Sequence, residues 1–303
     1  MRVIVIHNPE SGDDDHAREH LVDLIARAGH QVTYHSSKTD WQATLDRRPD
    51  LLAVAGGDGT VRKVARAVAG RNIPIAILPT GTANNVAGYL GLSGIPVDAL
   101  VDGWARGSLQ PFDLGVARGP WGSHWFLESV GVGALASLIA EVDTGRAGYV
   151  NEMDGREARI NAALDVLERV LNRSTPIVCE MTLDGLRLSG EYLLIEILNF
   201  GAAGPNLRLA PHADGADGVL NIALVEAHER PWLEQHLSDI RTNPSNVTPL
   251  RVRNAQHVTM RCASCALHID DEVWPPDGTL VDVEATIVHS AVSFLAPAAV
   301  KNG

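Results

Sequence analysis

The first hundred residues alternate between short apolar runs and amphipathic stretches, which predicts strands alternating with helices. Buried strands are predicted at Arg2–Ile6, Gln31–His35, Leu51–Ala55 and Ile73–Leu78. Helices are predicted at Asp15–Ala28 and Asp40–Arg47, and a third begins directly after Gly56–Thr60, with Val61, Val64, Ala65 and Val68 on one face. Alternation of this kind predicts an α/β domain built on a parallel sheet with right-handed crossovers.

The pattern changes after about Phe112, where strand-like runs dominate. They lie at Ile177–Leu183, Arg187–Leu198, Val219–Val225, His257–Arg261, Leu267–Ile269 and Leu280–Val288. Asp184-Gly185 predicts a hairpin between the first two runs, and one long helix is predicted at Arg156–Leu171. This half is expected to be an antiparallel, β-rich, sandwich-like domain over residues 116–289. The α/β domain is expected over residues 1–115, completed by residues 290–303, because the run Val292–Ala296 is predicted to return to it.

Charge and composition exclude several classes of protein. The net charge is −12 and no Lys/Arg cluster is present, so a nucleic-acid groove is not expected. Three cysteines are too few for a disulfide framework and suit a reducing cytoplasm. No apolar stretch is long enough to span a membrane. The chain is expected to be cytoplasmic, and transient contact with a membrane surface remains compatible with its acidic balance.

Three glycine-containing turns follow three of the predicted parallel strands, at Asn8–Gly12, Gly56–Thr60 and Thr80–Asn85. The carboxyl ends of parallel strands share one edge of a sheet, where ligands bind. Glycines let the backbone approach a ligand closely, and helix N-termini behind the turns attract phosphates. The turns therefore predict a phosphate-binding edge, although neither a Walker A motif nor GxGxxG occurs.

Asp58 makes this prediction more specific. A carboxylate among glycines would repel phosphate unless it handles Mg²⁺ or a hydroxyl proton. The alternative is that Asp58 only caps the helix that follows it.

The motifs together resemble the diacylglycerol kinase catalytic domain superfamily, which includes bacterial lipid kinases and sphingosine kinases and, more distantly, NAD kinases. The matching motifs are NPxSG at Asn8–Gly12, GGDGT at Gly56–Thr60 and PTGTxN at Pro79–Asn84. Leu209–Leu220 and His268–Glu272 match later family segments more loosely. The resemblance implies a phosphofructokinase/NAD kinase-like first domain and the cofactors ATP and Mg²⁺. It also implies phosphoryl transfer to a hydroxyl of diacylglycerol, a sphingoid base or a similar lipid.

The resemblance also implies roles for individual residues. The nucleotide would be contacted by Asn8, Ser11, Gly56, Gly57, Asp58, Gly59, Thr60, Gly81, Thr82 and Asn84. Asp58 would join the Mg²⁺ network, the general base would come from Asp270 and Glu272, and Asp217 would hold a structural Mg²⁺. The alternatives are a solvated turn at Asp270-Asp271-Glu272 and a simple Asp-Gly turn at Asp217.

Several departures from the family pattern keep other functions open. Asn85 and Asn221 stand where Asp is common, Asp271 replaces a Gly, and Phe126–Ser129 replaces Phe-x-Asn. One alternative is a kinase of a soluble acceptor, as NAD kinases are, and another is a non-catalytic nucleotide-binding homologue. Exposed edge strands would also offer a route to a homodimer.

Overall fold

The structure is a computed structural model, which describes residues 1–11, 18–243, 246–263, 265–274 and 280–297. The chain divides into two compact units, Met1–Phe112 with Ser290–Gly303 and Asp113–His289. It passes from one unit to the other within β5 (Ser108–Gly119) and again within β15 (Leu280–Ala296).

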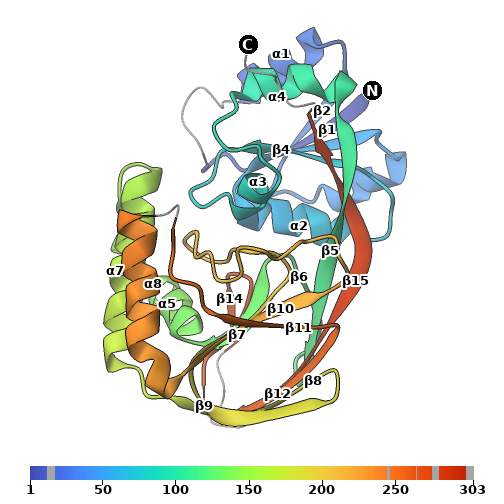
Figure 1. Cartoon of the computed structure of the whole chain (residues 1–303). Helices are drawn as coiled ribbons and strands as arrows, with labels where there is room; N and C mark the ends of the chain where they lie inside the picture. The colour runs from blue at the N-terminus through green and yellow to red at the C-terminus, as the bar shows by residue number, and fades with distance from the viewer. Residues whose placement is uncertain (12–17, 244–245, 264, 275–279, 298–303) are drawn as a thin grey trace. The chain divides into compact units, whose positions relative to one another are not determined.

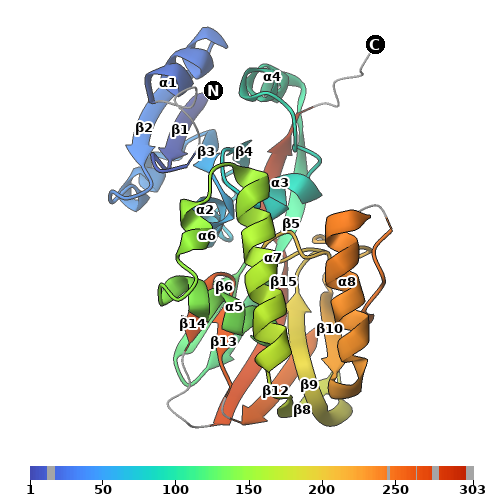
Figure 2. The ribbon, with the colours of Figure 1, turned by 90° about the vertical axis from the view of Figure 1, so that its left-hand side faces the viewer.

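Unit 1 contains a parallel sheet in the order β2-β1-β3-β4 (Figures 1 and 2). Its strands are β1 (Arg2–His7), β2 (Gln31–Ser36), β3 (Leu51–Gly56) and β4 (Ile75–Pro79). The end of β15 pairs with β4 in parallel through Phe294 and Ile75, so the last predicted run does return to this unit. The helical elements are α1 (Arg18–Arg27), η2 (Gln42–Arg47), α2 (Asp58–Val68), α3 (Asn85–Tyr89), α4 (Val97–Gly103) and η3 (Trp104–Arg106).

The core of unit 1 explains why its strands can be predicted. Every residue of β3 is buried, which is typical of parallel strands covered on both faces. The four apolar residues predicted on one face of α2 are all buried, at 1% exposure or less. The segment predicted as a helix near residues 40–47 is the 3₁₀ helix η2. The start of the helix predicted at Asp15 lies outside the described residues, and α1 is described from Arg18.

Unit 2 is a mainly antiparallel assembly whose central strand is β9 (Leu186–Leu198). Three strands pair with β9: β7 (Ser129–Gly133), β8 (Ile177–Leu183) and β10 (Leu220–Glu226). The other strands are β6 (Gly122–Phe126), β11 (Arg251–Ala255), β12 (His257–Ala263), β13 (Leu267–Ile269) and β14 (Glu272–Trp274). The predicted hairpin joins β8 to β9, and Asp184 and Gly185 both have positive φ.

Helices cover one side of the unit 2 strands, where α5, α7 and α8 lie side by side (Figures 1 and 2). They span Ala134–Asp143, Arg156–Arg173 and Arg230–Thr242, and the short helices α6 (Tyr149–Glu152) and η4 (Ala227–Glu229) accompany them. The prediction of a single helix in this half was therefore wrong. Leu135, Leu138, Ile139 and Val142 of α5 recur at i, i+3, i+4 and i+7, so the sequence does carry a helical signal for α5.

Unit 2 has two hydrophobic clusters. One lies among the strands and includes Val130, Ile195, Ile269 and the three cysteines. The other lies under the helices and includes Leu138, Val166 and Leu233. The cysteines are free and buried. None of the helices in the described part of the chain has the length and apolar character of a membrane-spanning segment.

Candidate functional site

The order of the unit 1 strands places two of the predicted turns side by side. β1 has β2 on one side and β3 on the other, so the strand order reverses between β1 and β3. Ligands bind at such switch points in parallel sheets, outside the carboxyl ends of the strands. The turn after β1 is tied to β3 at this point, because the Asn8 N–H donates to the Ala55 carbonyl at 2.9 Å.

The turns after β3 and β4 meet backbone against backbone. A Cβ placed on Gly81 would lie 2.2 Å from the Gly57 Cα, and one on Gly57 would lie 3.0 Å from the Gly81 Cα. No side chain fits between these glycines, so their role is close approach of two chain segments. The two turns form one surface of backbone groups rather than two separate loops.

Polar side chains hold this surface in shape. Asn84 accepts a hydrogen bond from the Gly81 N–H at 3.1 Å and donates one to the Gly81 carbonyl at 2.7 Å. Asn84 is buried and has a left-handed backbone, a conformation that Asn tolerates better than most residues. The Ser11 hydroxyl lies 2.9 Å from the Thr80 hydroxyl, which links the first turn to the third. Gly12, the end of the first motif, lies outside the described residues.

Asp58 connects the second and third turns. Its carboxylate accepts hydrogen bonds from the backbone N–H groups of Asn85 at 3.0 Å and Val86 at 3.1 Å. These amides belong to the first turn of α3, where negative charge is favoured. Asp58 therefore binds the N-terminus of α3 while it stands at the first position of its own helix α2. The N-cap residue of α2 is Gly57, which has no side chain with which to cap that helix.

The remaining predicted residues of this edge differ in exposure. Gly59 is exposed and Thr82 is half-buried. Thr60 is 8% exposed, and a Cβ on Gly56 would lie 2.6 Å from the Thr60 hydroxyl oxygen. Thr60 therefore packs beneath the turn, and its side chain supports the edge from below.

The candidate base Asp270 lies in unit 2, within a cradle of backbone amides. Its Oδ1 accepts hydrogen bonds from the N–H groups of Leu127 at 3.1 Å, Glu128 at 2.8 Å and Ser129 at 3.2 Å, and its Oδ2 accepts from Leu127 at 3.0 Å. Asp270 is 8% exposed. A buried carboxylate with this many donors is not part of a solvated turn, so that alternative is excluded for Asp270.

The backbone of Asp270 explains why the chain tolerates Asp271 in place of the family's glycine. Asp270 and Asp271 connect β13 to β14, in which Ile269 pairs with Glu272. The positive φ of this turn, 53°, falls on Asp270 and not on Asp271. A side chain at position 271 therefore needs no left-handed backbone. Glu272 is half-buried at the start of β14.

Behind Asp270 lies a buried ion pair that was not predicted. The His268 Nε2 is 3.0 Å from both carboxylate oxygens of Glu196, and the His268 Nδ1 is 2.7 Å from the Asp270 carbonyl oxygen. Burial lowers the pKa of His268, but the neighbouring Glu196 carboxylate outweighs burial and raises the pKa above its ordinary value.

Asp113 organises the loop that carries Asp217. The Gly218 N–H donates to the Asp113 Oδ2 at 2.7 Å, and the Asp113 carbonyl accepts from the Asn199 side chain at 2.7 Å. The Asp217 Oδ1 accepts from the Val219 N–H at 2.9 Å, as in an Asp-Gly turn. Burial, together with the charges of Asp214 and Asp113, raises the pKa of Asp217. Among the described residues, no three His, Cys, Asp or Glu side chains cluster as metal ligands.

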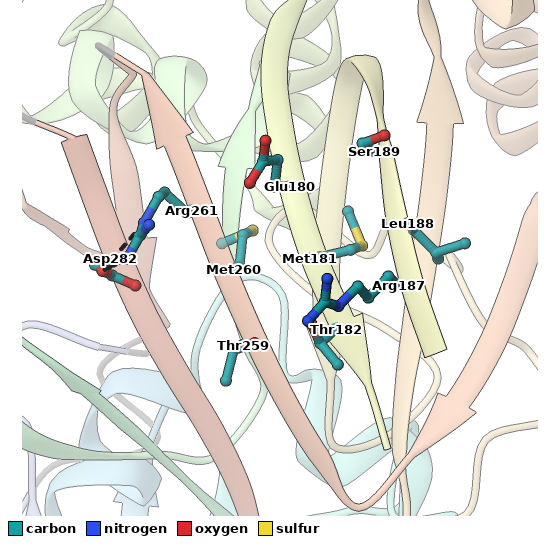
Figure 3. A pocket seen from close by; sticks show the side chains of 10 residues that line it. All are labelled: Glu180, Met181, Thr182, Arg187, Leu188, Ser189, Thr259, Met260, Arg261 and Asp282. Atoms are coloured by element: carbon teal, nitrogen blue, oxygen red, sulfur yellow. Dashed lines mark hydrogen bonds and ion pairs between the residues drawn. The ribbon is translucent and has the colours of Figure 1, made fainter. Parts of the chain in front are cut away.

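Two hollows in unit 2 lie apart from the Asp270 cradle. One, of about 680 Å³, opens on β8, β9, β12 and β15 and is rich in polar side chains, including the Arg261–Asp282 ion pair at 2.7 Å (Figure 3). The other, of about 460 Å³, has apolar residues such as Val170, Ile177 and Leu193 in its lining. No predicted site residue is among the residues that line either hollow.

The amides of Leu127–Ser129 and the Glu196–His268 pair are the main features that sequence reasoning missed. One signal was available. Glu196 and His268 are lone polar residues in apolar runs, and Gly131 interrupts another apolar run, Ser129–Gly133. A glycine inside a strand often marks close approach of another group.

Comparison with known proteins agrees with this geometry. Residues 2–117 match the family described as diacylglycerol kinase catalytic domain, and residues 136–296 match the YegS C-terminal NAD kinase beta sandwich-like domain. The diacylglycerol kinase of Mycobacterium tuberculosis (strain H37Rv) is 26% identical over 91% of this chain and 85% of its own length. A protein of Stenotrophomonas maltophilia named "Probable lipid kinase YegS-like" is 26% identical over 73% of this chain and 72% of its own length.

The fold also matches a solved structure. A crystal structure of a diacylglycerol kinase from Bacillus anthracis superposes with a TM-score of 0.68 at 18% identity, covering 99% of this chain and 98% of that one. The α/β and sandwich-like fold classes are thereby confirmed. The chain belongs to the diacylglycerol kinase and YegS-like lipid kinase family. It is an ATP-dependent phosphotransferase with an alcohol group as acceptor.

Proposed function

We propose that the protein transfers the γ-phosphoryl group of ATP to a hydroxyl of diacylglycerol, a sphingoid base or a similar lipid. The observation that carries the proposal is a pair of carboxylates held by backbone amides, Asp58 at the glycine edge and Asp270 in its cradle. The names of the relatives from M. tuberculosis and S. maltophilia support a lipid acceptor.

The glycine edge of unit 1 would bind the nucleotide phosphates. Gly57 and Gly81 present backbone without side chains, and the N-terminus of α2 adds a partial positive charge. Asn8, Ser11 and Thr82 would contribute polar contacts from the neighbouring turns. Two nearby lysines already have partners, because Lys38 pairs with Glu10 of the turn after β1 and Lys63 donates to the Ser37 carbonyl. Backbone groups and a metal ion would therefore neutralise much of the phosphate charge.

Mg²⁺ fits this edge as part of a nucleotide complex. Mg²⁺ in such sites is held by one or two carboxylates, with phosphate oxygens and waters completing the shell. Asp58 supplies one carboxylate in a fixed orientation, which suits this arrangement without a cluster of three acidic residues. When bound, Mg²⁺ would screen the charge that develops on the transferred phosphoryl group. The role of Asp217 as a ligand of a second, structural Mg²⁺ stays a prediction.

Asp270 would act on the acceptor hydroxyl. Phosphoryl transfer has a loose transition state in which the attacking hydroxyl loses its proton late, so orientation matters more than strong basicity. Four hydrogen bonds from three consecutive amides fix the Asp270 carboxylate in one orientation. We assign Asp270 as the base that accepts the hydroxyl proton, with Glu272 as the second carboxylate of this turn.

The test is transfer of labelled γ-phosphate from ATP and Mg²⁺ to purified diacylglycerol, to sphingosine and to a total lipid extract. Asp58→Asn and Asp270→Asn are compared with the wild type, and circular dichroism confirms that each variant is folded. We expect labelled lipid with the wild type and a loss of at least about 100-fold in each variant. Wild-type-like transfer by both variants would overturn the assignment of the two carboxylates.

The other outcomes separate the remaining functions. In a parallel assay with NAD as the acceptor, label that appears in NAD and in no lipid would indicate a kinase of a soluble acceptor. ATP binding by the wild type without transfer to either class of acceptor would indicate a non-catalytic homologue. Label in one purified lipid would identify the acceptor.

A further inference from the structure

Three neighbouring strands of unit 2 align one residue each in a row beneath the Asp270 turn. Gly131 of β7 pairs with His268 of β13 on one side and with Glu196 of β9 on the other. Paired residues on adjacent antiparallel strands project to the same face of a sheet. The side chains of His268 and Glu196 therefore project to the same face on either side of Gly131, and they meet across it.

Gly131 is required for this meeting. A Cβ on Gly131 would lie 2.3 Å from the Glu196 Oε1 and 2.4 Å from its Cδ. The φ of Gly131 is not positive, so the backbone itself does not demand glycine. The glycine instead leaves space for the Glu196 carboxylate, which explains a residue that is otherwise unfavourable inside a strand.

The two side chains are buried at 0% exposure for Glu196 and 1% for His268. Both imidazole nitrogens of His268 are used. A carbonyl oxygen can only accept, so Nδ1 must carry a proton and donate it to Asp270. Nε2 shares a proton with the Glu196 carboxylate, either as an imidazolium–carboxylate pair or as its neutral equivalent.

The carbonyl of Asp270 is thereby anchored, and the other polar groups of this residue are anchored too. Its N–H donates to the Ser129 carbonyl at 2.8 Å, and its carboxylate accepts from the three cradle amides. The left-handed backbone of Asp270 is unfavourable for a residue with a side chain, so it needs contacts of this kind to persist.

We propose that Glu196 and His268, given room by Gly131, form a positioning pair that holds Asp270 in its left-handed conformation through the Asp270 carbonyl and so aims its carboxylate at the acceptor. The proposal rests on the role assigned to Asp270 above. Neither Glu196 nor His268 contacts the acceptor in this scheme, and both act through the backbone of Asp270.

The experiment compares steady-state kinetics of the lipid-kinase reaction in four variants. Gly131→Ala displaces the Glu196 carboxylate while keeping both charged groups, and His268→Gln removes the imidazole. Glu196→Leu removes the carboxylate, and Glu196→Gln keeps a hydrogen-bonding partner for His268. We expect the first three to lower kcat by about 10- to 100-fold, the loss that follows a misplacement of about 1 Å. The KM for ATP should not change, because the glycine edge belongs to unit 1. Glu196→Gln should lose less than Glu196→Leu.

His236→Gln is the matched control. His236 is also a buried histidine of unit 2 whose Nδ1 hydrogen-bonds to a carbonyl, that of Thr248 at 2.7 Å, but it lies on α8, which contributes Leu233 and Leu237 to the other hydrophobic cluster. Its replacement should lower the melting temperature and leave kcat unchanged. Folded Gly131→Ala and His268→Gln proteins with wild-type kcat would overturn the positioning role.

A measurement on the wild-type protein tests the proposal even if the variants do not fold. Hydrogen exchange should show that the amides of Leu127, Glu128 and Ser129 exchange as slowly as the central amides of β9. Rapid exchange of these amides would show that Asp270 is not held, which would also overturn the proposal. Failure of the proposed function is distinct from both results, because it would appear as Asp270→Asn retaining full activity.

Discussion

Asp58 and Asp270 are both carboxylates held by backbone amides, yet the chain places them in different ways. Asp58 follows β3 directly and binds amides 27 and 28 residues further along, within the same parallel sheet and its turns. Asp270 binds amides 141 to 143 residues before it in the sequence, through the pairing of β13 with β7. The first site is organised by short connections, and the second by long-range strand register.

This difference has consequences for how each site can fail. Backbone contacts between glycines shape the unit 1 edge, so a methyl group added to one of these glycines should disrupt this edge most. A buried ion pair between side chains supports the unit 2 cradle. Removing one member of the pair leaves the other charge buried and unpaired, and this change should disrupt the cradle most.

The largest effect on stability is expected from His268→Leu. This change leaves the Glu196 carboxylate buried at 0% exposure without its partner. Removing one partner of a buried ion pair costs about 3–5 kcal/mol. Urea unfolding should therefore show a loss of this size.

The double variant Glu196→Leu/His268→Leu sharpens the result. It removes both charges, so it should be more stable than His268→Leu alone. A double variant less stable than either single variant would mean that the two residues stabilise the fold independently and not as a pair.

A smaller loss of stability, with a large loss of function, is expected from Gly81→Ala. Its Cβ would lie 2.2 Å from the Gly57 Cα and 2.8 Å from the Asn84 Oδ1, so the backbone of Gly57 would have to move. Overpacking of this kind costs about 1–3 kcal/mol. Because the turns must separate, ATP affinity measured by calorimetry should fall as well.

Gly88→Ala is the control for Gly81→Ala. Gly88 is an exposed residue of α3, and its added Cβ would meet only the Ser93 hydroxyl at 3.6 Å. It should retain ATP affinity and gain up to about 1 kcal/mol of stability, since Ala favours helix over Gly. Equal affinities in Gly81→Ala and the wild type would show that the glycine contact does not shape the nucleotide site.

Unit 1 was largely predictable because its signals are local. The strands β1, β3 and β4 are continuous apolar runs, and the turn motifs stand at their ends, so a parallel sheet brings the motifs to one edge. The contact of Gly57 with Gly81 and the hydrogen bonds between Asn84 and Gly81 were not predictable, because they depend on how the turns pack.

Unit 2 was predictable only in outline. Most of its longer strands were found, because an apolar alternation bounded by turn residues is visible in sequence. The register was not predictable, because a strand pattern does not state its partner. The alignment of His268, Gly131 and Glu196 depends on two registers at once. Asp270 was proposed as a site residue through the family resemblance, whereas the Glu196–His268 pair behind it is visible only in the structure.

Ser11→Ala should have a modest effect in unit 1. It removes the hydroxyl that lies 2.9 Å from the Thr80 hydroxyl, which links the first and third turns, and that also donates to the Asn8 carbonyl at 2.9 Å. A single hydrogen bond of this kind is worth about 1 kcal/mol. The KM for ATP should rise about fivefold with little change in melting temperature, and Thr80→Ala should give a similar rise. A rise in only one of the two variants would show that the link between the hydroxyls is not what matters.

The smallest effect expected is a difference in pH dependence between two buried histidines of unit 2. Burial lowers the pKa of His236 below 6.5, so its stabilising contribution is present above pH 6.5 and is lost as pH falls through the lowered pKa. The Glu196 carboxylate raises the pKa of His268 above 6.5 despite burial, so its contribution is present below pH 6.5 and is lost as pH rises through the raised pKa.

Unfolding free energies measured from about pH 5 to about pH 9 in the wild type, His236→Gln and His268→Gln should separate the two histidines. His236→Gln should flatten the loss of stability on the acid side, and His268→Gln should flatten a loss on the alkaline side. Both side chains are buried and both donate to a carbonyl through Nδ1, so burial and that bond cannot cause the opposite signs. The sign is set by what faces Nε2, which is a carboxylate only for His268. Slopes of the same sign for the two histidines would show that Glu196 does not hold a shared proton with His268.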